Sequence, residues 1–290
     1  MDEAQKSETL RQACDHIMSE SKAVAYAVAL HDYETGFRLA INAGQRFHAA
    51  STIKVAILLA ICKAIDDGQI RADHTLHVRN RFFSAVDRTP FRLDAESDGY
   101  PQLYRSIGRT ARISDLTEWM IVSSSNLATN LLIDVIGLDQ ARRSIERRGL
   151  AGVDLQRGVE DDRAFEAGSN NRITANGAVG LLRAIHNGLG FAPGAAKAMI
   201  DVLLDQQFGG GIVPGLPEAV QTVARVAHKT GDISTVSHDI GLVFLPGRPP
   251  YAVALLTESG GDGAERTAAL TAASRAVYDA VTAAGETGWR

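Results

Sequence analysis

Large apolar side chains that alternate with small or polar ones predict β-strands toward both ends of the chain. Apolar side chains recur at every second position over residues 24–30 and 37–41, on either side of a turn-forming stretch at residues 32–36. Two such strands joined by a short turn form an antiparallel hairpin. Three further strand patterns follow late in the chain, over residues 222–230, 238–245 and 251–257.

The long stretch between the two strand groups has the periodicity of helices. Residues 51–65 are apolar on nearly every side, which is typical of a buried helix. Another helical pattern begins near Asp115 and Glu118, which have capping-box spacing. This pattern is interrupted at residues 123–125, then resumes and stops at Gly137.

The order of elements predicts an α+β fold: a five-stranded antiparallel sheet with terminal helices packed on it, and an inserted helical block. Residues 1–50 and 209–290 would form the sheet lobe, and residues 51–208 an all-α lobe. The polar stretch 78–110 is expected to run over the surface, and Gly209–Gly211 to form a hinge. We expect one structural unit with a ligand-binding cleft between its lobes.

Composition narrows the classes of function. Hydrophobic residues make up 45% and charged residues 22% of the 290 residues, as in a soluble globular protein. The net charge of −4 does not suggest a nucleic-acid partner. No apolar run approaches the roughly 20 residues of a membrane span. Residues 2–20 are polar with helical spacing and carry no export signal, so we expect a cytoplasmic protein, or an exported one whose leader has been removed.

Neither a metal nor another cofactor is expected, because the cysteines and histidines lack ligand spacing.

The first candidate for chemistry is Ser51, with Lys54 three residues later. At the start of a helix the backbone N–H groups are free and the dipole favours negative charge, so a serine there can attack a carbonyl. The stem of Lys54 enters an apolar run, and a desolvated lysine becomes a neutral base. The alternative, a capping serine and a solvated lysine, fits that apolar run poorly.

The second candidate is Ser124 with Asn126, where the helical pattern breaks. Ser124 could pass a proton to a leaving nitrogen, and the amide of Asn126 could hold a substrate carbonyl and the lysine together. A purely structural polar loop is the alternative.

The third candidate is Lys229-Thr230-Gly231, at the end of a predicted strand. Lys229 can pair with a substrate carboxylate and Thr230 can donate a hydrogen bond to it. Gly231 would let substrate lie against the backbone, and the N–H of Asp232 would be a second oxyanion donor. The alternative is a simple turn after a strand.

These motifs occur in the order S-x-x-K, S-x-N and K-T-G, and the chain thereby resembles class A β-lactamases and penicillin-binding proteins. The resemblance covers nearly the whole chain and implies a β-lactamase/transpeptidase-like fold. It implies that Ser51 is acylated, Lys54 is the base or proton shuttle, and Ser124 protonates the leaving nitrogen. Asn126 would bind the substrate amide, and the remaining pocket residues would bind its carboxylate and oxyanion: Lys229, Thr230, Gly231 and Asp232.

Two departures from the class A pattern bear on activity. Ser125 stands where class A enzymes usually have aspartate, and the usual Glu-x-Asn pattern that supplies the deacylation base is missing. Glu160 or Glu166 could provide that carboxylate instead, or both could belong to a solvated loop. A β-lactamase is therefore the leading hypothesis for a small-molecule β-lactam or acyl-peptide substrate. A D-alanyl-D-alanine carboxypeptidase, penicillin-binding protein or esterase-like hydrolase is the alternative, and a non-catalytic sensor is another.

Overall fold

The computed structural model describes residues 2–283, which cluster into two compact units. Among these residues, the sheet unit comprises residues 2–52, 174–182 and 209–283, and the helical unit comprises residues 53–173 and 183–208. This division differs from the expected lobes mainly in residues 174–182. The N–H of Asn176 donates to the carbonyl of Ala43, which ties that segment to the sheet unit.

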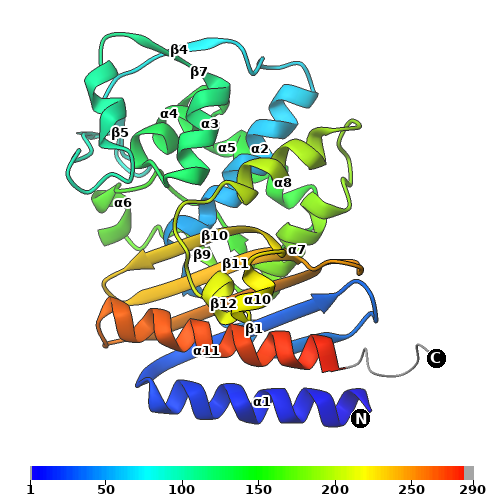
Figure 1. Ribbon diagram of the computed structural model, residues 1–290. Coiled ribbons are helices and arrows are strands. Elements are labelled where there is room, and N and C mark those ends of the chain that lie inside the picture. The colour runs from blue at the N-terminus through cyan, green and yellow to red at the C-terminus, as the bar shows by residue number, and fades with distance from the viewer. Residues whose placement is uncertain (1, 284–290) are drawn as a thin grey trace. The chain divides into compact units, whose positions relative to one another are not determined.

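The sheet unit is built on a five-stranded antiparallel sheet in the order β10-β11-β12-β1-β2 (Figure 1). Its strands have the following bounds: β1 Ala23–Asp32, β2 Arg38–Ile41, β10 Arg225–Ile233, β11 Val236–Phe244 and β12 Tyr251–Ser259. The predicted α+β class, the five strands and the N-terminal hairpin are confirmed. The short strand β3 Phe47–His48 follows β2 in the chain and does not belong to this sheet.

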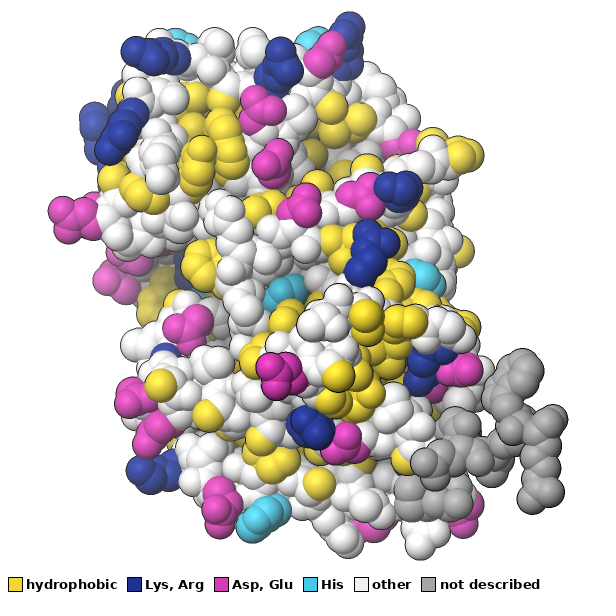
Figure 2. Space-filling model, in the orientation of Figure 1, with side chains coloured by type: hydrophobic (Ala, Val, Ile, Leu, Met, Phe, Trp, Pro, Cys, Tyr) yellow, Lys and Arg dark blue, Asp and Glu magenta, His cyan; other side chains and the backbone are white. Residues whose placement is uncertain are grey.

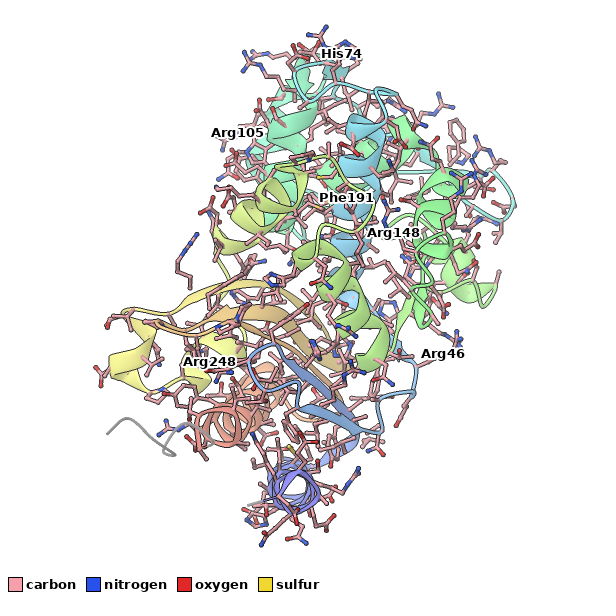
Figure 3. All side chains as sticks on the ribbon, turned by 90° about the vertical axis from the view of Figure 1, so that its right-hand side faces the viewer. Arg46, His74, Arg105, Arg148, Phe191 and Arg248 are labelled. Atoms are coloured by element: carbon pink, nitrogen blue, oxygen red, sulfur yellow. The ribbon has the colours of Figure 1, made fainter. Side chains whose placement is uncertain are left out.

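Two terminal helices, α1 Glu3–Glu20 and α11 Gly263–Thr282, cover one face of this sheet (Figure 1). Leu10, Cys14 and Met18 of α1 share one hydrophobic core with apolar side chains of β1, β2, β12 and α11. The short helices α9 Ile212–Gly215 and α10 Glu218–Gln221 lead into β10. Arg248 closes the β1–β2 turn by pairing with Asp32 and, at 2.7 Å, with Glu34 (Figure 3).

The helical unit is organised around α2 Ile53–Asp66. Residues 53–61 of α2 are all buried, as an all-round apolar helix requires, because α3, α4, α5 and α8 pack around it. Those helices have the following bounds: α3 Ile113–Val122, α4 Asn126–Ile136, α5 Leu138–Glu146 and α8 Ala195–Leu204. The guanidinium of Arg148 lies 4.6 Å from the ring centre of Phe191, which joins the end of α5 to the loop before α8 (Figure 3).

Short elements complete the two units. They are the strands β4 Thr75–His77, β5 Phe82–Phe83, β6 Pro90–Phe91, β7 Thr110–Arg112, β8 Val153–Asp154 and β9 Arg172–Ile173, the 3₁₀ helices η1 Ala50–Thr52 and η2 Pro101–Ser106, α6 Asp162–Glu166, and α7 Ala175–His186. The polar stretch 78–110 therefore contains small strand pairs and a 3₁₀ helix. The helix α7 starts in the sheet unit and ends in the helical unit.

Two local expectations need correction. The buried helix begins at Ile53, because Ala50–Thr52 forms a 3₁₀ turn. The expected capping box at Asp115 and Glu118 is wrong, since α3 already begins at Ile113 and its N-cap residue makes no side-chain cap.

Within residues 2–283, no helix combines the length and apolarity needed to cross a bilayer. Basic and acidic side chains are interspersed on the face shown in Figure 2.

Candidate active site

Ser51 lies in the middle of η1, directly before the buried helix α2. The preceding residue, Ala50, has φ 44, a left-handed conformation that costs a non-glycine residue of order 1 kcal/mol. Hydrogen bonds on both sides hold this turn: the N–H of Ala50 donates to His48 Nδ1 at 3.0 Å, and Thr52 Oγ1 donates to the carbonyl of Ala49 at 2.5 Å. Thr52 is buried while Ser51 is only half-buried, so the turn is fixed but its serine is accessible.

The strand β10 lies against this turn within the sheet unit. A Cβ added at Gly231 would come 3.1 Å from Thr52 Cγ2 and 3.2 Å from Ala50 Cβ. The absence of a side chain at Gly231 therefore lets η1 pack closely on the strand that carries Lys229 and Thr230.

The Lys229 side chain is fully buried, and its Nζ donates to the carbonyl of Thr230 at 2.9 Å. On the neighbouring strand β11, Asp239 is the residue opposite Thr230. The K-T-G triplet does not end β10 as expected, because Asp232 and Ile233 still pair with β11. Ser237 Oγ donates to the exposed Asp232 carboxylate, which also lies 3.4 Å from Arg266 Nη2. Because these partners occupy the side chain of Asp232, its backbone N–H is the group considered for binding an oxyanion.

Asp239 was not anticipated from the sequence, although it supports the K-T-G strand. Its buried carboxylate accepts hydrogen bonds from His228 Nδ1 at 2.9 Å, and from the N–H groups of Gly211 and Ile212 at 3.0 and 2.9 Å. A Cβ at Gly210 would lie 2.2 Å from Asp239 Oδ2. The glycine cluster that we expected to form a hinge is therefore hydrogen-bonded to strand β11 through Asp239. At Gly210 the backbone passes so close to the Asp239 carboxylate that only glycine fits.

Lys54 is the second residue of α2 and is completely buried in the helical unit. Its Nζ donates to the carbonyl of Ser124 at 2.6 Å, to Ser124 Oγ at 3.1 Å and to Asn126 Oδ1 at 2.7 Å. Burial lowers the pKa of Lys54 to about 7, although the carboxylates of Asp98 and Glu160 act in the opposite direction. A substantial fraction of this amine is therefore neutral at physiological pH and able to accept a proton.

The turn that carries Ser124 and Asn126 joins α3 to α4. Ser124 has φ 57, and the next residue, Ser125, is the N-cap of α4, where its Oγ accepts from the N–H of Ala128 at 3.2 Å. Serine and aspartate are both good N-cap residues. The departure from aspartate at this position is therefore compatible with the same turn.

Glu160 contacts this cluster directly. Its Oε1 accepts from Asn126 Nδ2 at 2.5 Å, and its backbone has φ 56. Burial raises the pKa of the Glu160 carboxyl above its ordinary value, against the hydrogen bond from Asn126, which lowers it. Glu166, in contrast, is exposed at the end of α6.

Asn130 explains how Glu160 is held, and sequence reasoning missed it. From α4, its Nδ2 donates to the carbonyl of Val159 and its Oδ1 accepts from the N–H of Val159, both at 2.9 Å. Gly158 passes close to the same amide, since a Cβ there would lie 3.0 Å from Asn130 Oδ1. The sequence did show an asparagine one helical turn after Asn126, on the same face of the helix. Its role could not be inferred because its partner, Val159, is distant in sequence.

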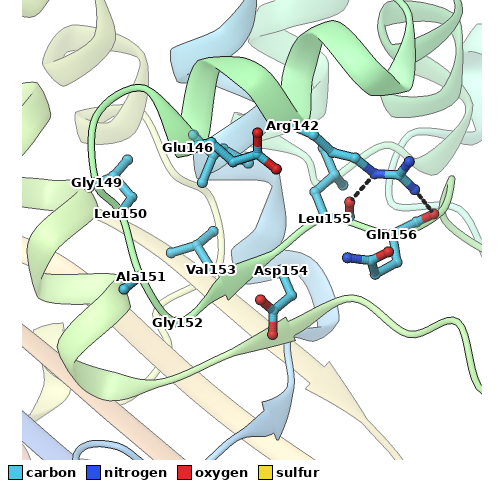
Figure 4. Close-up of a pocket in the computed structure, with 11 residues that line it drawn as sticks. Arg142, Glu146, Gly149, Leu150, Ala151, Gly152, Val153, Asp154, Leu155 and Gln156 are labelled. Carbon is cyan, nitrogen blue, oxygen red and sulfur yellow. Dashed lines mark hydrogen bonds between the residues drawn. The ribbon is translucent and has the colours of Figure 1, made fainter.

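A separate cavity of about 340 Å³ opens in the helical unit beside α5 and β8 (Figure 4). Residues between Arg142 and Gln156 line it, a segment that contains no predicted site residue. The Arg142 guanidinium crosses one side and donates to the carbonyls of Leu155 and Gln156. This cavity is therefore distinct from the Lys54 cluster.

Comparison with known proteins provides independent information. The model of a family described as the Beta-lactamase enzyme family matches residues 9–281. A solved β-lactamase from Sphaerobacter thermophilus DSM 20745 is 26% identical with a TM-score of 0.79, over 94% of this chain and 97% of that one. A mutant of PBP-A, solved as an acyl-enzyme complex with penicillin G, is 25% identical with a TM-score of 0.77, over 94% and 96%.

A β-lactamase from Xanthomonas campestris pv. campestris str. ATCC 33913 shares the fold, with 23% identity and a TM-score of 0.80 over 95% of this chain and 98% of that one. No curated protein matches the sequence. The family match spans nearly all of the chain, and the solved structures agree with the sheet and helices described above. The chain therefore belongs to the β-lactamase enzyme family and has the β-lactamase/transpeptidase-like fold of its serine hydrolases.

Proposed function

We propose that this protein hydrolyses β-lactams through an acyl-enzyme on Ser51, in the manner of a class A-like β-lactamase. One observation carries the proposal: Lys54 is fully buried, has a pKa of about 7, and is bound by Ser124 and Asn126, while Glu160 binds the other end of the same Asn126 amide. A base for acylation and a carboxylate for deacylation are thus linked through one side chain.

Acylation begins with the neutral form of Lys54. As an ammonium it donates three hydrogen bonds, so loss of one proton frees a lone pair at this position. The amine takes the Ser51 proton as Oγ attacks the lactam carbonyl, and the carbon–nitrogen bond then breaks. Ser124, already in contact with Lys54, passes a proton to the leaving nitrogen, and Lys54 replaces it. An ester on Ser51 and a secondary amine result.

Substrate binding is assigned to Asn126 and to residues of the K-T-G strand. Asn126 would donate to the substrate amide, and Lys229 and Thr230 would bind the carboxylate. Gly231 leaves room beside the strand, and the N–H groups of Ser51 and Asp232 would stabilise the oxyanion. The fixed turn at Ser51 and the buried Lys229 support this assignment.

Deacylation is assigned to Glu160. A half-buried carboxylate with a raised pKa is a stronger base than an exposed one, and it would take a proton from the water that attacks the ester. As the tetrahedral intermediate breaks down, that proton is returned to Ser51 Oγ, which leaves as the alcohol, and the opened acid is released with Glu160 again ionised. The exposed position of Glu166 makes it the less favoured candidate.

The second candidate is a penicillin-binding D-alanyl-D-alanine peptidase that is acylated by β-lactams but deacylates slowly. The solved acyl-enzyme of a PBP-A mutant with penicillin G, which is 25% identical to this chain, supports this second candidate. The two candidates differ in whether Glu160 activates water.

Intact-protein mass spectrometry during incubation with benzylpenicillin, alongside substrate loss, separates them. We expect a transient adduct and continued consumption, and Ser51→Ala should remove both. A persistent adduct without turnover would favour the peptidase, which would then be tested by release of D-alanine from a muramyl peptide. Reversible binding that survives Ser51→Ala would instead indicate a sensor.

A further inference from the structure

Asp98 is a buried carboxylate beside the turn that carries Ser124 and Asn126. Only 6% of its surface is exposed. Its Oδ2 accepts from the N–H of Leu127 at 2.8 Å and from the Tyr104 hydroxyl at 3.1 Å, and its Oδ1 accepts from the N–H of Tyr100 at 2.8 Å. Leu127 is the second residue of α4, so Asp98 satisfies a backbone donor that the helix itself leaves open.

The backbone next to Asp98 is pressed against the same turn. A Cβ added at Gly99 would lie 1.9 Å from the carbonyl oxygen of Ser123, so only glycine fits there. Tyr100 then stacks on Trp119 of α3, with ring centres 4.9 Å apart and planes at 20°. Asp98 is therefore held from three directions against the segment whose oxygens bind Lys54.

Asp98 also acts on the lysine through its charge. Within the helical unit, the charged groups that act on Lys54 are the carboxylates of Asp98 and Glu160, and Asp98 has the larger effect. Both raise the pKa of Lys54 against the desolvation that lowers it. Asp98 also raises the pKa of Glu160, because its negative charge opposes ionisation of that carboxyl.

We propose that Asp98 is a positioning residue for the Lys54 base: its carboxylate anchors the Ser124–Asn126 turn around the amine and supplies a fixed negative charge to it. This inference rests on the proposed function for its kinetic consequence, but its electrostatic part concerns Lys54 alone. The S-x-x-K and S-x-N motifs thus depend on a third segment, which the sequence patterns did not connect to them.

The test uses Asp98→Asn in the full chain, with Asp94→Asn as the matched control. Asp94 is an exposed carboxylate in the same loop, and its replacement removes an equal charge. Lys54 is titrated by NMR with ¹³C-labelled lysine, and the acylation rate is followed over pH. In Asp98→Asn we expect the midpoint of the Lys54 titration to move down by roughly one pH unit, the smallest shift typical of losing a nearby opposite charge. The acidic limb of the pH profile for acylation should move down by the same amount. The maximal acylation rate should fall about tenfold or more as the turn loosens, and Asp94→Asn should change neither quantity.

An unmoved midpoint in Asp98→Asn would overturn the electrostatic role, and an unchanged maximal rate would overturn the anchoring role. If Asp98→Asn does not fold, Asp98→Glu replaces it: the charge stays, so the midpoint should hold while the rate falls. A shifted midpoint or a wild-type rate in Asp98→Glu would overturn the inference. Failure of the proposed function is recognised separately, as a wild-type protein that neither acylates nor hydrolyses β-lactams, while the NMR titration still decides the effect on Lys54.

Discussion

Replacing Glu160 with glutamine should convert a hydrolase into a protein that traps its substrate. Glutamine has the same length and can still accept the hydrogen bond that Glu160 receives from Asn126 Nδ2 at 2.5 Å. What disappears is the proton-accepting charge. Asn130 holds the backbone of this segment through Val159, so the substitution leaves the loop in place.

The expected magnitude follows from the role of the lost group. A positioned general base contributes about 10²- to 10⁴-fold, which corresponds to about 3–5 kcal/mol in the deacylation barrier. Acylation should be much less affected. Because Glu160 is one of two carboxylates that raise the pKa of Lys54, its loss lowers that pKa further, and the acidic limb of acylation should move to lower pH.

Stopped-flow kinetics with a chromogenic cephalosporin, paired with intact mass spectrometry, measure the two steps separately. Glu160→Gln should give a stoichiometric burst followed by slow turnover, with the adduct on Ser51 as the dominant species. Glu166→Gln is the matched control, since that carboxylate is exposed at the end of α6 and should keep wild-type turnover. Wild-type steady-state turnover in Glu160→Gln would refute the assignment, and a loss confined to Glu166→Gln would transfer the role to that residue.

Four other predictions concern the remaining parts of the site. Lys54 acts when neutral, so the acylation rate should rise with pH through about 7 and fall about tenfold per unit below it; a flat single-turnover profile between pH 5 and 8 would contradict this. Ser51→Ala should abolish labelling by a fluorescent penicillin on a denaturing gel, with the melting temperature serving as the folding control. Gly231→Ala should slow acylation and cost about 1–3 kcal/mol in denaturant unfolding, because its Cβ would crowd Thr52 and Ala50 at 3.1 and 3.2 Å. Gly210→Ala should destabilise by more than about 1 kcal/mol, since it combines φ 57 with a Cβ 2.2 Å from Asp239, whereas Gly209→Ala, which has open space, should not; equal melting temperatures would refute the account.

Periodicity was sufficient to predict most of the fold. The five strands were recognisable because each alternates or forms a short apolar run, and α2 because its residues 53–61 are apolar on all sides apart from Lys54. Element ends were less predictable. Ser51 was expected in a helix but lies in a 3₁₀ turn, and β10 continues past Gly231 because its partner strand continues beside it.

The site residues divide in the same way. Ser51, Lys54 and Lys229 could be selected because they belong to short motifs with a chemical reason for their spacing. The proposed role of Glu160, in preference to Glu166, could not be inferred from the sequence, since it depends on a backbone with φ 56 that Asn130 holds from another helix. Asp98 and Asp239 were missed for a related reason: each acts by accepting backbone N–H groups, and backbone donors leave no mark in the sequence.

The division of the chain into two units has a consequence for anyone who wishes to cut or rewire it. The chain passes from one unit to the other after residues 52, 173, 182 and 208, so each unit is assembled from separated stretches. A protease that cleaves one of these passages splits the chain into two fragments but does not separate the units, because at least one fragment still contains stretches of both. Neither unit can be expressed as one uninterrupted fragment. Split-protein reporters and circular permutants should therefore be opened at an exposed turn inside a single unit, such as Gly36 or Gly247, where the glycine has positive φ and a Cβ would meet nothing within 4 Å.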